Sequence, residues 1–480
     1  MTCLEPHVQC HHIHRTKTHT NDHCIPQRIM MKWEQLLSNK RLGQEQQPHK
    51  KDDRTEFQRD YDRLIFSAPF RRLQNKTQVF PLPGSIFVHN RLTHSLEVSS
   101  VGRSLGNDVA RELLQRHPHL ADTHITEMGS IVSAACLAHD LGNPPFGHSG
   151  EKAIGTYFSE GNGSFLKDYY CDETGDSLTS EQWQDLVCFE GNANAFRLLT
   201  HHFNGRRKGG FVMTYSTLAS IVKYPFSSSL AGGKRKFGFF CDETEDYRRI
   251  ADELGIRRYD SPAGTLRYAR YPLVYLVEAA DDICYEIMDI EDAHKLKILT
   301  TPETKELLLS YFGAEQREHI IERMSTLGDV NEQVVYLRSC VINALETECV
   351  KVFVDNEETI LAGDFQGSLI DHISEIPRQA YRNCEKVSYA RIYRTRDVMD
   401  IEIAGYKVIT TLTDMMVQAV IHTDKAFSQL LINRVSAQYG IKAPTLYGRI
   451  MAVLDYISGM TDVYAMEMYR NINGMSIPTL

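Results

Sequence analysis

The 480-residue sequence contains no run of 18 apolar residues, so we expect no membrane-spanning helix. Residues 1–20 lack the apolar core of a signal peptide, and the eleven cysteines show no paired spacing. Both absences favour a cytoplasmic protein with reduced thiols. The phosphate-binding patterns GxGxxG and GxxxxGK[ST] are also missing, so a nucleotide has to be held in another way. A net charge of -9 gives no global attraction to nucleic acid, although a local basic patch remains compatible with it.

The N-terminal residues 1–29 differ in composition from the rest of the chain. The first thirty residues hold six of the twenty histidines and three of the eleven cysteines, without a helical or strand period. A segment with so little apolar surface cannot form a packed core, so we predict a disordered extension. The alternative is a metal site of non-standard spacing, formed by Cys10, His12, His14 and Cys24. The following stretch, "MMKWEQLLSNKRLG", reads like a natural start, which makes Met30 or Met31 the expected first residue.

The remaining sequence predicts an all-α protein with a few short strands. Apolar residues recur at helical spacing over 91–115, 128–140, from His148 onward, 271–293, 302–350 and 407–460. Strand-type alternation is rare. The stretch "VMDIEIAGY", 398–406, is one example, and it predicts a small hairpin.

The stretch "CLAHDLGNPPFGHSGEKAI", 136–154, concentrates groups that bind metals or transfer protons. His139 and Asp140 end a helix whose preceding residues, "IVSAACLA", are nearly all apolar. Desolvating a carboxylate there is costly unless a positive group pairs with it, and a metal ion is such a group. A helix that simply ends in two polar residues is the plain alternative.

Two distant features favour the metal. "NRLTHSLEV" places His94 in a helix with an apolar face, and "VEAADDICY" places Asp281 and Asp282 within another helix. Taken singly, a core histidine and a solvated acidic face are the ordinary explanations. Taken together, these residues and the His-Asp pair form a mixed imidazole and carboxylate set. Such sets suit Mn, Fe, Co, Zn or Mg rather than a structural zinc, which prefers thiolates.

This ordered spread of a histidine, a His-Asp pair and an aspartate resembles the HD-domain phosphohydrolase superfamily. Six blocks resemble the deoxyguanosine triphosphate triphosphohydrolase (dGTPase) family more closely: "FRRLQNKTQVFPLPG", "RLTHSLEV", "AHDLGNPPFGHSGEKAI", "FEGNANAFRLL", "EAADDICY" and "YISGMTDVYA". The resemblance runs from about Trp33 to Tyr469. It implies a mainly helical HD-domain catalytic core over residues 30–300. A helical C-terminal region over residues 301–480 would complete the nucleotide pocket.

The resemblance also implies roles for individual residues. The ligands of one divalent metal ion (Mg, Mn or Co) would be His94, His139, Asp140 and Asp281. The catalytic pair would be His148 and Glu151, whose i, i+3 spacing independently puts both on one helix face. Contacts to the substrate would come from Gln78, Arg91, Asn192, Lys223, Lys236, Tyr285, Tyr393, Glu402 and Arg434. Within that set, Tyr285 would crowd a 2′-hydroxyl, Gln78 would contact the 3′-hydroxyl, and Tyr393 and Glu402 would contact the base.

The implied reaction is metal-dependent hydrolysis of a deoxynucleoside triphosphate, with dGTP as the expected substrate, to a deoxynucleoside and inorganic triphosphate. The resemblance further implies a homo-oligomer and a single-stranded DNA or nucleotide activator. One alternative is an HD-type phosphodiesterase or nucleotidase. Basic residues in several distant blocks, enough for three phosphates, argue against it. The other alternative is a nucleotide or single-stranded DNA binding protein, against which the complete pair of His148 and Glu151 argues.

Overall fold

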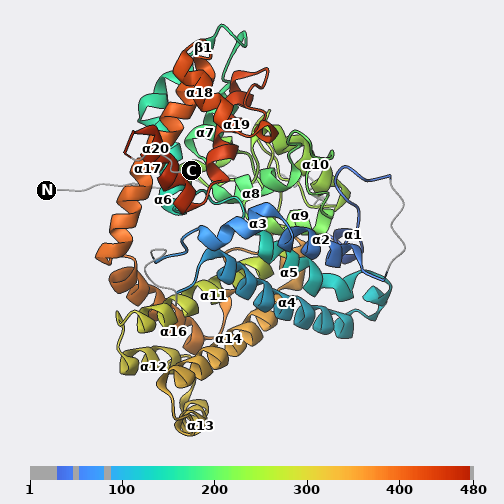
Figure 1. The fold of residues 1–480 in the computed structure, drawn as a ribbon. Coiled ribbons are helices and arrows are strands. Elements are labelled where there is room, and N and C mark those ends of the chain that lie inside the picture. Colours follow the sequence, from blue (N-terminus) through green and yellow to red (C-terminus); the bar gives the residue numbers. More distant parts are fainter. Residues whose placement is uncertain (1–29, 47–52, 81–87, 476–480) are drawn as a thin grey trace, which may run out of the picture.

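The computed structural model describes residues 30–46, 53–80 and 88–475, and these fold mainly into helices (Figure 1). The predicted extension over residues 1–29 lies outside the described residues. Two short strands, β1 (Tyr170–Cys171) and β2 (Asp176–Ser177), pair as an antiparallel hairpin. The expected all-α fold with a few short strands is therefore confirmed. Across these three ranges, we find no helix with both the length and the apolar character that a membrane span requires.

Two hydrophobic cores organise the helices. The larger core draws on helices in the lower part and on the right-hand side of Figure 1. These are α1 (Trp33–Leu36), α2 (Glu56–Ile65), α3 (Ala68–Arg72), α4 (Arg91–Arg116), α5 (Met128–Ala138), α9 (Tyr215–Ile221), α10 (Thr244–Glu253), α11 (Val274–Lys295), α12 (Thr301–Leu309), α13 (Ala314–Ser325), α14 (Val330–Asp355), α15 (Glu357–Leu361) and α16 (Glu375–Val387).

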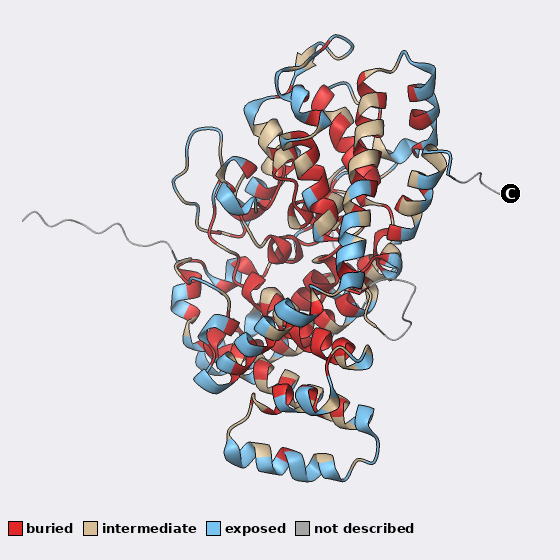
Figure 2. Cartoon of the chain, turned by 90° about the vertical axis from the view of Figure 1, so that its left-hand side faces the viewer, coloured by how far each residue is buried: buried red, intermediate tan, exposed pale blue. Residues whose placement is uncertain are grey.

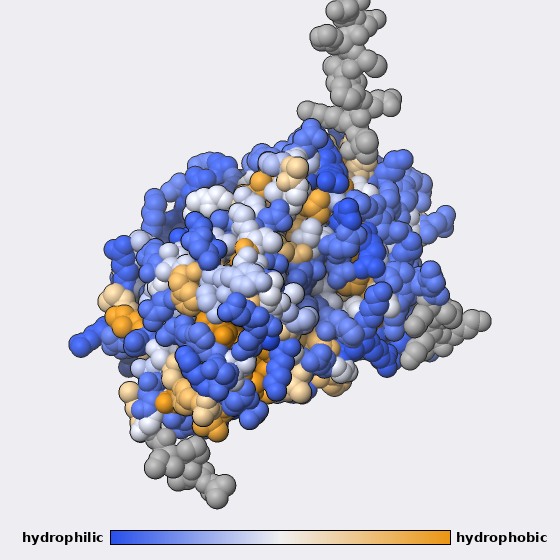
Figure 3. All heavy atoms as spheres, turned by 90° about the horizontal axis from the view of Figure 1, so that it is seen from above, coloured by the Kyte–Doolittle hydropathy of each residue, from blue (hydrophilic) through white to orange (hydrophobic). Residues whose placement is uncertain are grey.

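The second core lies in the upper part of Figure 1. Its helices are α6 (His148–Ser159), α7 (Ser180–Val187), α17 (Arg396–Ile421), α18 (Ala426–Arg434), α19 (Leu446–Ser458) and α20 (Asp462–Ile472). Helix α8 (Gly191–Thr200) contributes apolar side chains to both cores. Buried residues run through the middle of both groups of helices in Figure 2. The surface seen from above is mostly hydrophilic, with apolar residues scattered over it in small groups (Figure 3).

Helix α5 is the central helix of the larger core, because nearly all of its residues are buried. It packs closely on α4 through glycines. A Cβ on Gly106 of α4 would lie 2.7 Å from the Cα of Gly129 in α5. Helix α4 itself starts with a capping box in which Asn90 and Thr93 satisfy each other's backbone N–H groups. The close approach of the two helices brings His94 of α4 beside His139 at the end of α5.

The predicted hairpin over 398–406 is wrong, because these residues form the first turns of helix α17. Their alternation does not mark a buried sheet face: Met399 and Ile403 are exposed. The buried positions are Val398, Gly405, Val408, Ile409 and Leu412, which recur at the spacing of a helix face. Helix α11 begins at Val274, slightly after the predicted start at residue 271.

Candidate functional site

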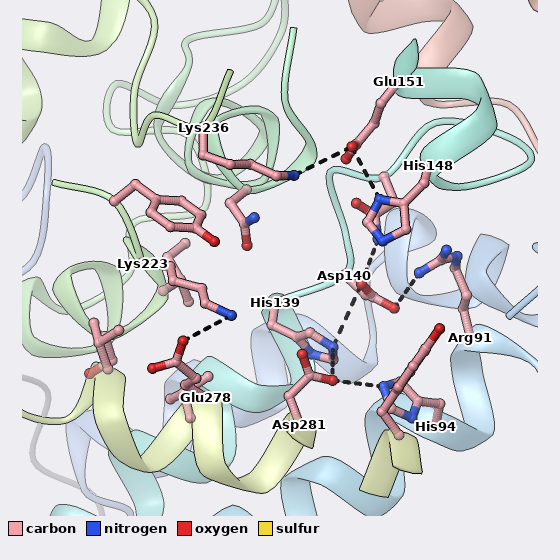
Figure 4. A pocket seen from close by; sticks show the side chains of 18 of the residues that line it. Arg91, His94, His139, Asp140, His148, Glu151, Lys223, Lys236, Glu278 and Asp281 are labelled. Carbon is pink, nitrogen blue, oxygen red and sulfur yellow. Dashed lines mark hydrogen bonds and ion pairs between the residues drawn. The ribbon is translucent and has the colours of Figure 1, made fainter. Parts of the chain in front are cut away.

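A cavity of about 240 Å³ lies between α4, α6, α8, α9 and α11 and the loops that follow α5 and α9 (Figure 4). All six residues predicted as metal ligands or catalytic residues line it: His94, His139, Asp140, His148, Glu151 and Asp281. Six of the nine predicted substrate contacts line it as well: Gln78, Arg91, Asn192, Lys223, Lys236 and Tyr285. Residues that lie up to about 200 positions apart in the sequence therefore share one chamber.

His94, His139 and Asp281 bring three donor atoms within 4.8 Å of one another. The Oδ1 atom of Asp281 lies 3.1 Å from Nε2 of His94 and 3.4 Å from Nε2 of His139. The Oδ1 atom of Asp140 lies 3.6 Å from the same nitrogen of His139. Burial raises the pKa of Asp281, but the two histidines outweigh it and hold the pKa well below its usual range. The two imidazoles and the carboxylate of Asp281, with the carboxylate of Asp140 beside His139, form a donor set that suits a divalent metal ion.

The hydrogen bonding of His139 fits such a role. Its Nδ1 atom lies 2.6 Å from the carbonyl oxygen of Cys136, one turn earlier in α5, to which an Nδ1 proton is donated. Its Nε2 atom is buried and has no hydrogen-bond partner among the described residues. A backbone bond on one ring nitrogen fixes the tautomer and leaves the other nitrogen free to bind a metal. The residues present therefore fit a divalent ion.

Arg91 fixes the orientation of Asp140. Its guanidinium Nη1 donates to Oδ2 of Asp140 at 2.5 Å, and the side-chain amide of Asn143 donates to Oδ1. Burial raises the pKa of Asp140, but the charges of Arg91, His139 and His94 together outweigh it and bring the pKa to about 2. The carboxylate is therefore charged at neutral pH and its oxygens point at fixed donors.

His148 and Glu151 lie on adjacent turns at the start of α6, as their spacing predicts. The side chain of His148 is 82% exposed at the edge of the cavity, whereas that of Glu151 is only 10% exposed. Oε1 of Glu151 accepts the backbone N–H of Gly191 at 2.9 Å, and Oε2 lies 3.3 Å from Nδ1 of His148. This hydrogen bond and the charge of Glu151 raise the pKa of His148. Glu151 is thus anchored on α8 and holds the histidine ring.

Three cationic side chains face the cavity, each paired with an acid. Arg91 binds Asp140, Lys223 lies 3.1 Å from Glu278, and Lys236 lies 2.7 Å from Glu190 and 3.6 Å from Glu151. The lining of the cavity holds these three cations and four carboxylates, those of Asp140, Glu151, Glu278 and Asp281. With the histidines left aside, these groups carry a net negative charge. A divalent ion would make the net charge of the lining positive, as the binding of an anionic ligand requires.

Tyr285 projects into the cavity from α11, four residues after Asp281. Its ring centre lies 6.4 Å from that of His94, and its other face is supported by Tyr393 at 6.1 Å. Gln78 also lines the cavity, and its Oε1 atom is buried without a hydrogen-bond partner in the described ranges. Both side chains are thus placed to contact a ligand that fills the cavity.

Three predicted substrate contacts lie outside the lining. Tyr393 stands behind Tyr285, where its hydroxyl donates to Asp289 at 2.6 Å. Glu402 is exposed on α17, and its backbone carbonyl accepts from Ser149. Arg434 is exposed at the last residue of α18. In this chain by itself, these three side chains do not line the cavity.

Sequence reasoning overlooked other residues of the lining, notably Asn143, Tyr224 and Glu278. Glu278 lies three residues before Asp281, so the helical spacing on α11 could have revealed it. It binds both Lys223 and Arg270, at 3.1 and 2.6 Å. Asn143 lies within the quoted motif but carries no obvious chemical signature.

A second group of potential metal donors, His201, Asp242 and Glu243, lies elsewhere in the described part of the chain. There Arg197 donates to Glu243 at 2.7 Å and to Asp242 at 3.3 Å, and it also binds Asp455. Because a buried guanidinium already pairs with these carboxylates, we interpret this group as a structural ion-pair network rather than a metal centre.

The chain matches two family models and several known proteins. Residues 91–182 match the HD domain, and residues 372–471 match the phosphohydrolase-associated domain. A deoxyguanosinetriphosphate triphosphohydrolase-like protein of Pseudomonas aeruginosa is 36% identical over 458 residues, which cover 94% of this chain and 100% of the relative. A protein of the same description from Synechocystis is 37% identical over 461 residues, which cover 93% of this chain and 100% of the relative. A deoxyguanosinetriphosphate triphosphohydrolase of Salmonella arizonae is 31% identical over 489 residues, which cover 87% of this chain and 93% of the relative.

Proposed function

Because the chain belongs to the deoxyguanosinetriphosphate triphosphohydrolase family of HD-domain phosphohydrolases, we propose that it hydrolyses deoxynucleoside triphosphates in a metal-dependent reaction. The products would be a deoxynucleoside and inorganic triphosphate, with dGTP as the first candidate substrate. One observation supports this most strongly. A single cavity contains a cluster of metal donors, an oriented histidine and three cationic side chains.

We propose His94, His139, Asp140 and Asp281 as the ligands of one Mg, Mn or Co ion. The low pKa of Asp140 supports this set, because a carboxylate ligand has to be deprotonated to bind. The Nε2 atom of His139 supports it too, since it has no hydrogen-bond partner among the described residues and lies within 3.6 Å of an oxygen of each aspartate. When bound, the ion would polarise the α-phosphate and make a water molecule more acidic. It would also turn the net charge of the lining positive.

The cationic side chains would bind the phosphates. Lys223 and Lys236 extend from separate loops on the side of the cavity opposite Arg91 (Figure 4). In the free protein an acid holds each of these side chains in place. Each lysine therefore loses little conformational entropy when it turns to a phosphate oxygen. Arg91 keeps its bond to Asp140 and would contact phosphate with its remaining N–H groups, since a guanidinium carries five.

His148 would act as the proton donor. Attack of water at the α-phosphorus breaks the bond to the 5′-oxygen of the sugar, and that oxygen needs a proton as it leaves. The exposed ring of His148 can reach a substrate at the edge of the cavity, and Glu151 raises its pKa so that it remains protonated at a higher pH.

Tyr285 would pack against C2′ of the sugar and leave no room for a ribose hydroxyl.

Product analysis tests this proposal. The protein is incubated with each of the four dNTPs in Mg, Mn or Co, and the products are separated by ion-exchange chromatography. Equal amounts of deoxynucleoside and triphosphate are expected. Release of orthophosphate or pyrophosphate would instead support a nucleotidase or another phosphohydrolase. Binding of nucleotide or single-stranded DNA with no turnover in any metal would support a binding protein.

A further inference from the structure

The loop between α5 and α6, residues 139–147, sets the position of two proposed metal ligands and of the proposed proton donor, His148. It begins with the His-Asp pair and ends where His148 starts α6. Its last two residues have a positive φ, +63° at Phe146 and +56° at Gly147. A left-handed conformation is unfavourable for phenylalanine, so contacts from the surrounding structure have to maintain it.

Those contacts come from the segment that matches the phosphohydrolase-associated domain, residues 372–471. Asp462, the first residue of α20, is buried and lies within the block "YISGMTDVYA". Its Oδ1 accepts the backbone N–H of Phe146 at 2.9 Å, and its Oδ2 accepts that of Thr77 at 2.8 Å. One carboxylate therefore joins the strained loop to the segment before α4.

A second contact fixes the ring of Phe146. Gly405 lies in the middle of α17, and a Cβ placed there would be 2.5 Å from Cγ and 2.6 Å from Cβ of Phe146. The ring thus fills a slot that exists only because residue 405 has no side chain. In the first turn of α6, Ser149 donates to the carbonyl oxygen of Glu402 at 2.9 Å, which holds the start of α6 on α17.

A third contact holds the middle of the loop. The ammonium group of Lys76 donates to the carbonyl oxygen of Asn143 at 2.5 Å and to that of Ser458 at 2.8 Å. Lys76 and Thr77 are adjacent, so this short segment ties the loop to the corner between α19 and α20 at two points. The loop is held at Asn143 and at Phe146, on either side of the Pro-Pro turn.

From these contacts we infer that Asp462 and Gly405 are positioning residues, through which the phosphohydrolase-associated segment directs His148 toward the metal cluster. They touch neither the cavity nor the reacting atoms. They act by holding Phe146 in its left-handed conformation, which determines the direction in which α6 begins. This inference rests on the proposed role of His148.

Asp462→Asn provides the first test. An asparagine offers one acceptor oxygen and one NH₂ group, so either Phe146 or Thr77 would face a donor instead of an acceptor. A misplacement of about 1 Å costs about a hundredfold in rate, so we expect kcat for triphosphate release to fall at least tenfold. KM and the bound metal should stay near their wild-type values, because the phosphate-binding cations and the ligands keep their own contacts. The matched control is Glu467→Gln, an exposed acid on the same helix.

Hydrogen–deuterium exchange supplies a readout that does not depend on turnover. In Asp462→Asn the amides of residues 143–151 should exchange faster than in the wild type, whereas α18 should be unchanged. A kcat within twofold of the wild type would overturn the inference. So would a loss of kcat without faster exchange in this loop. If the wild-type protein released no triphosphate, the proposed function would fail, and the exchange result would still test the loop contacts.

A double-mutant cycle keeps the inference testable if Asp462→Asn does not fold. Gly405→Ala should lower kcat because its methyl group displaces the ring of Phe146. In a Phe146→Gly background the same methyl group meets neither the ring nor the Cβ of residue 146, so Gly405→Ala should add little further loss. Ile403→Ala, at an exposed position of the same helix, is the control. Independent, additive losses at residues 405 and 146 would contradict the inference.

Discussion

Replacing Glu151 by glutamine removes one charge from the proposed proton-transfer pair and changes little else. The amide oxygen of the glutamine can still accept the N–H of Gly191, so the start of α8 keeps its contact. Lys236 loses a neighbour at 3.6 Å but keeps Glu190 at 2.7 Å. The carboxylate beside Nδ1 of His148 is the group that is lost.

The expected effect follows from the hydrogen bond and charge by which Glu151 raises the pKa of His148. A group with a raised pKa stays protonated to higher pH, so a donor histidine is active below that pKa and loses activity as the pH rises through it. Without the carboxylate the pKa falls, and the descending limb of the kcat profile moves to lower pH. General acid catalysis contributes about 10²–10⁴-fold. Because the histidine remains, we expect a loss below that range, about ten- to a hundredfold near pH 8 and less near pH 6.

The assay is kcat for triphosphate release between about pH 5.5 and 9, for the wild type, Glu151→Gln and His148→Ala. Glu160→Gln, an exposed acid at the end of the same helix, is the control and should behave as the wild type. In the His148→Ala background, Glu151→Gln should cause little further loss. A descending limb that stays in place, or a further tenfold loss in that background, would show that Glu151 does not act through His148.

Three further predictions concern the metal, the sugar and stability. Asp281→Ala should lose bound metal and activity together, whereas Asp282→Ala should retain metal; elemental analysis after dialysis against a low metal concentration distinguishes them. Tyr285→Ala should narrow the ratio of kcat/KM for dGTP over GTP, since it opens space beside C2′ and removes a contact with the sugar; an unchanged ratio would mean that ribose is rejected elsewhere. Arg197→Leu should lower the free energy of unfolding by roughly 3–5 kcal/mol, because it leaves the carboxylate of Asp455 buried without a counter-charge. Denaturant titration measures this loss, and a value below 1 kcal/mol would refute the reasoning.

Local spacing in the sequence was sufficient for much of the fold and part of the site. The helix over 91–115 and the helix that starts at His148 follow from residues that are neighbours on one face, and the structure places both close to the predicted bounds. The same local rule puts Asp281 and Tyr285 on one side of α11. It failed at 398–406, where alternation over a few residues was not distinguishable from the exposed side of a long helix. The domain division at residue 300 stays a prediction.

Only the tertiary structure decided which side chains of distant blocks meet. The blocks around Gln78, Asn192 and Lys236 carry no local signal of their order around a cavity, and chain folding alone brought them together. It also left Tyr393, Glu402 and Arg434 outside the lining. The positive φ of Phe146 and its contacts with Asp462 and Gly405 could not be predicted from the sequence either. A helix is stabilised by interactions between residues three and four apart, which the sequence displays. Contacts across hundreds of residues depend instead on how whole helices pack.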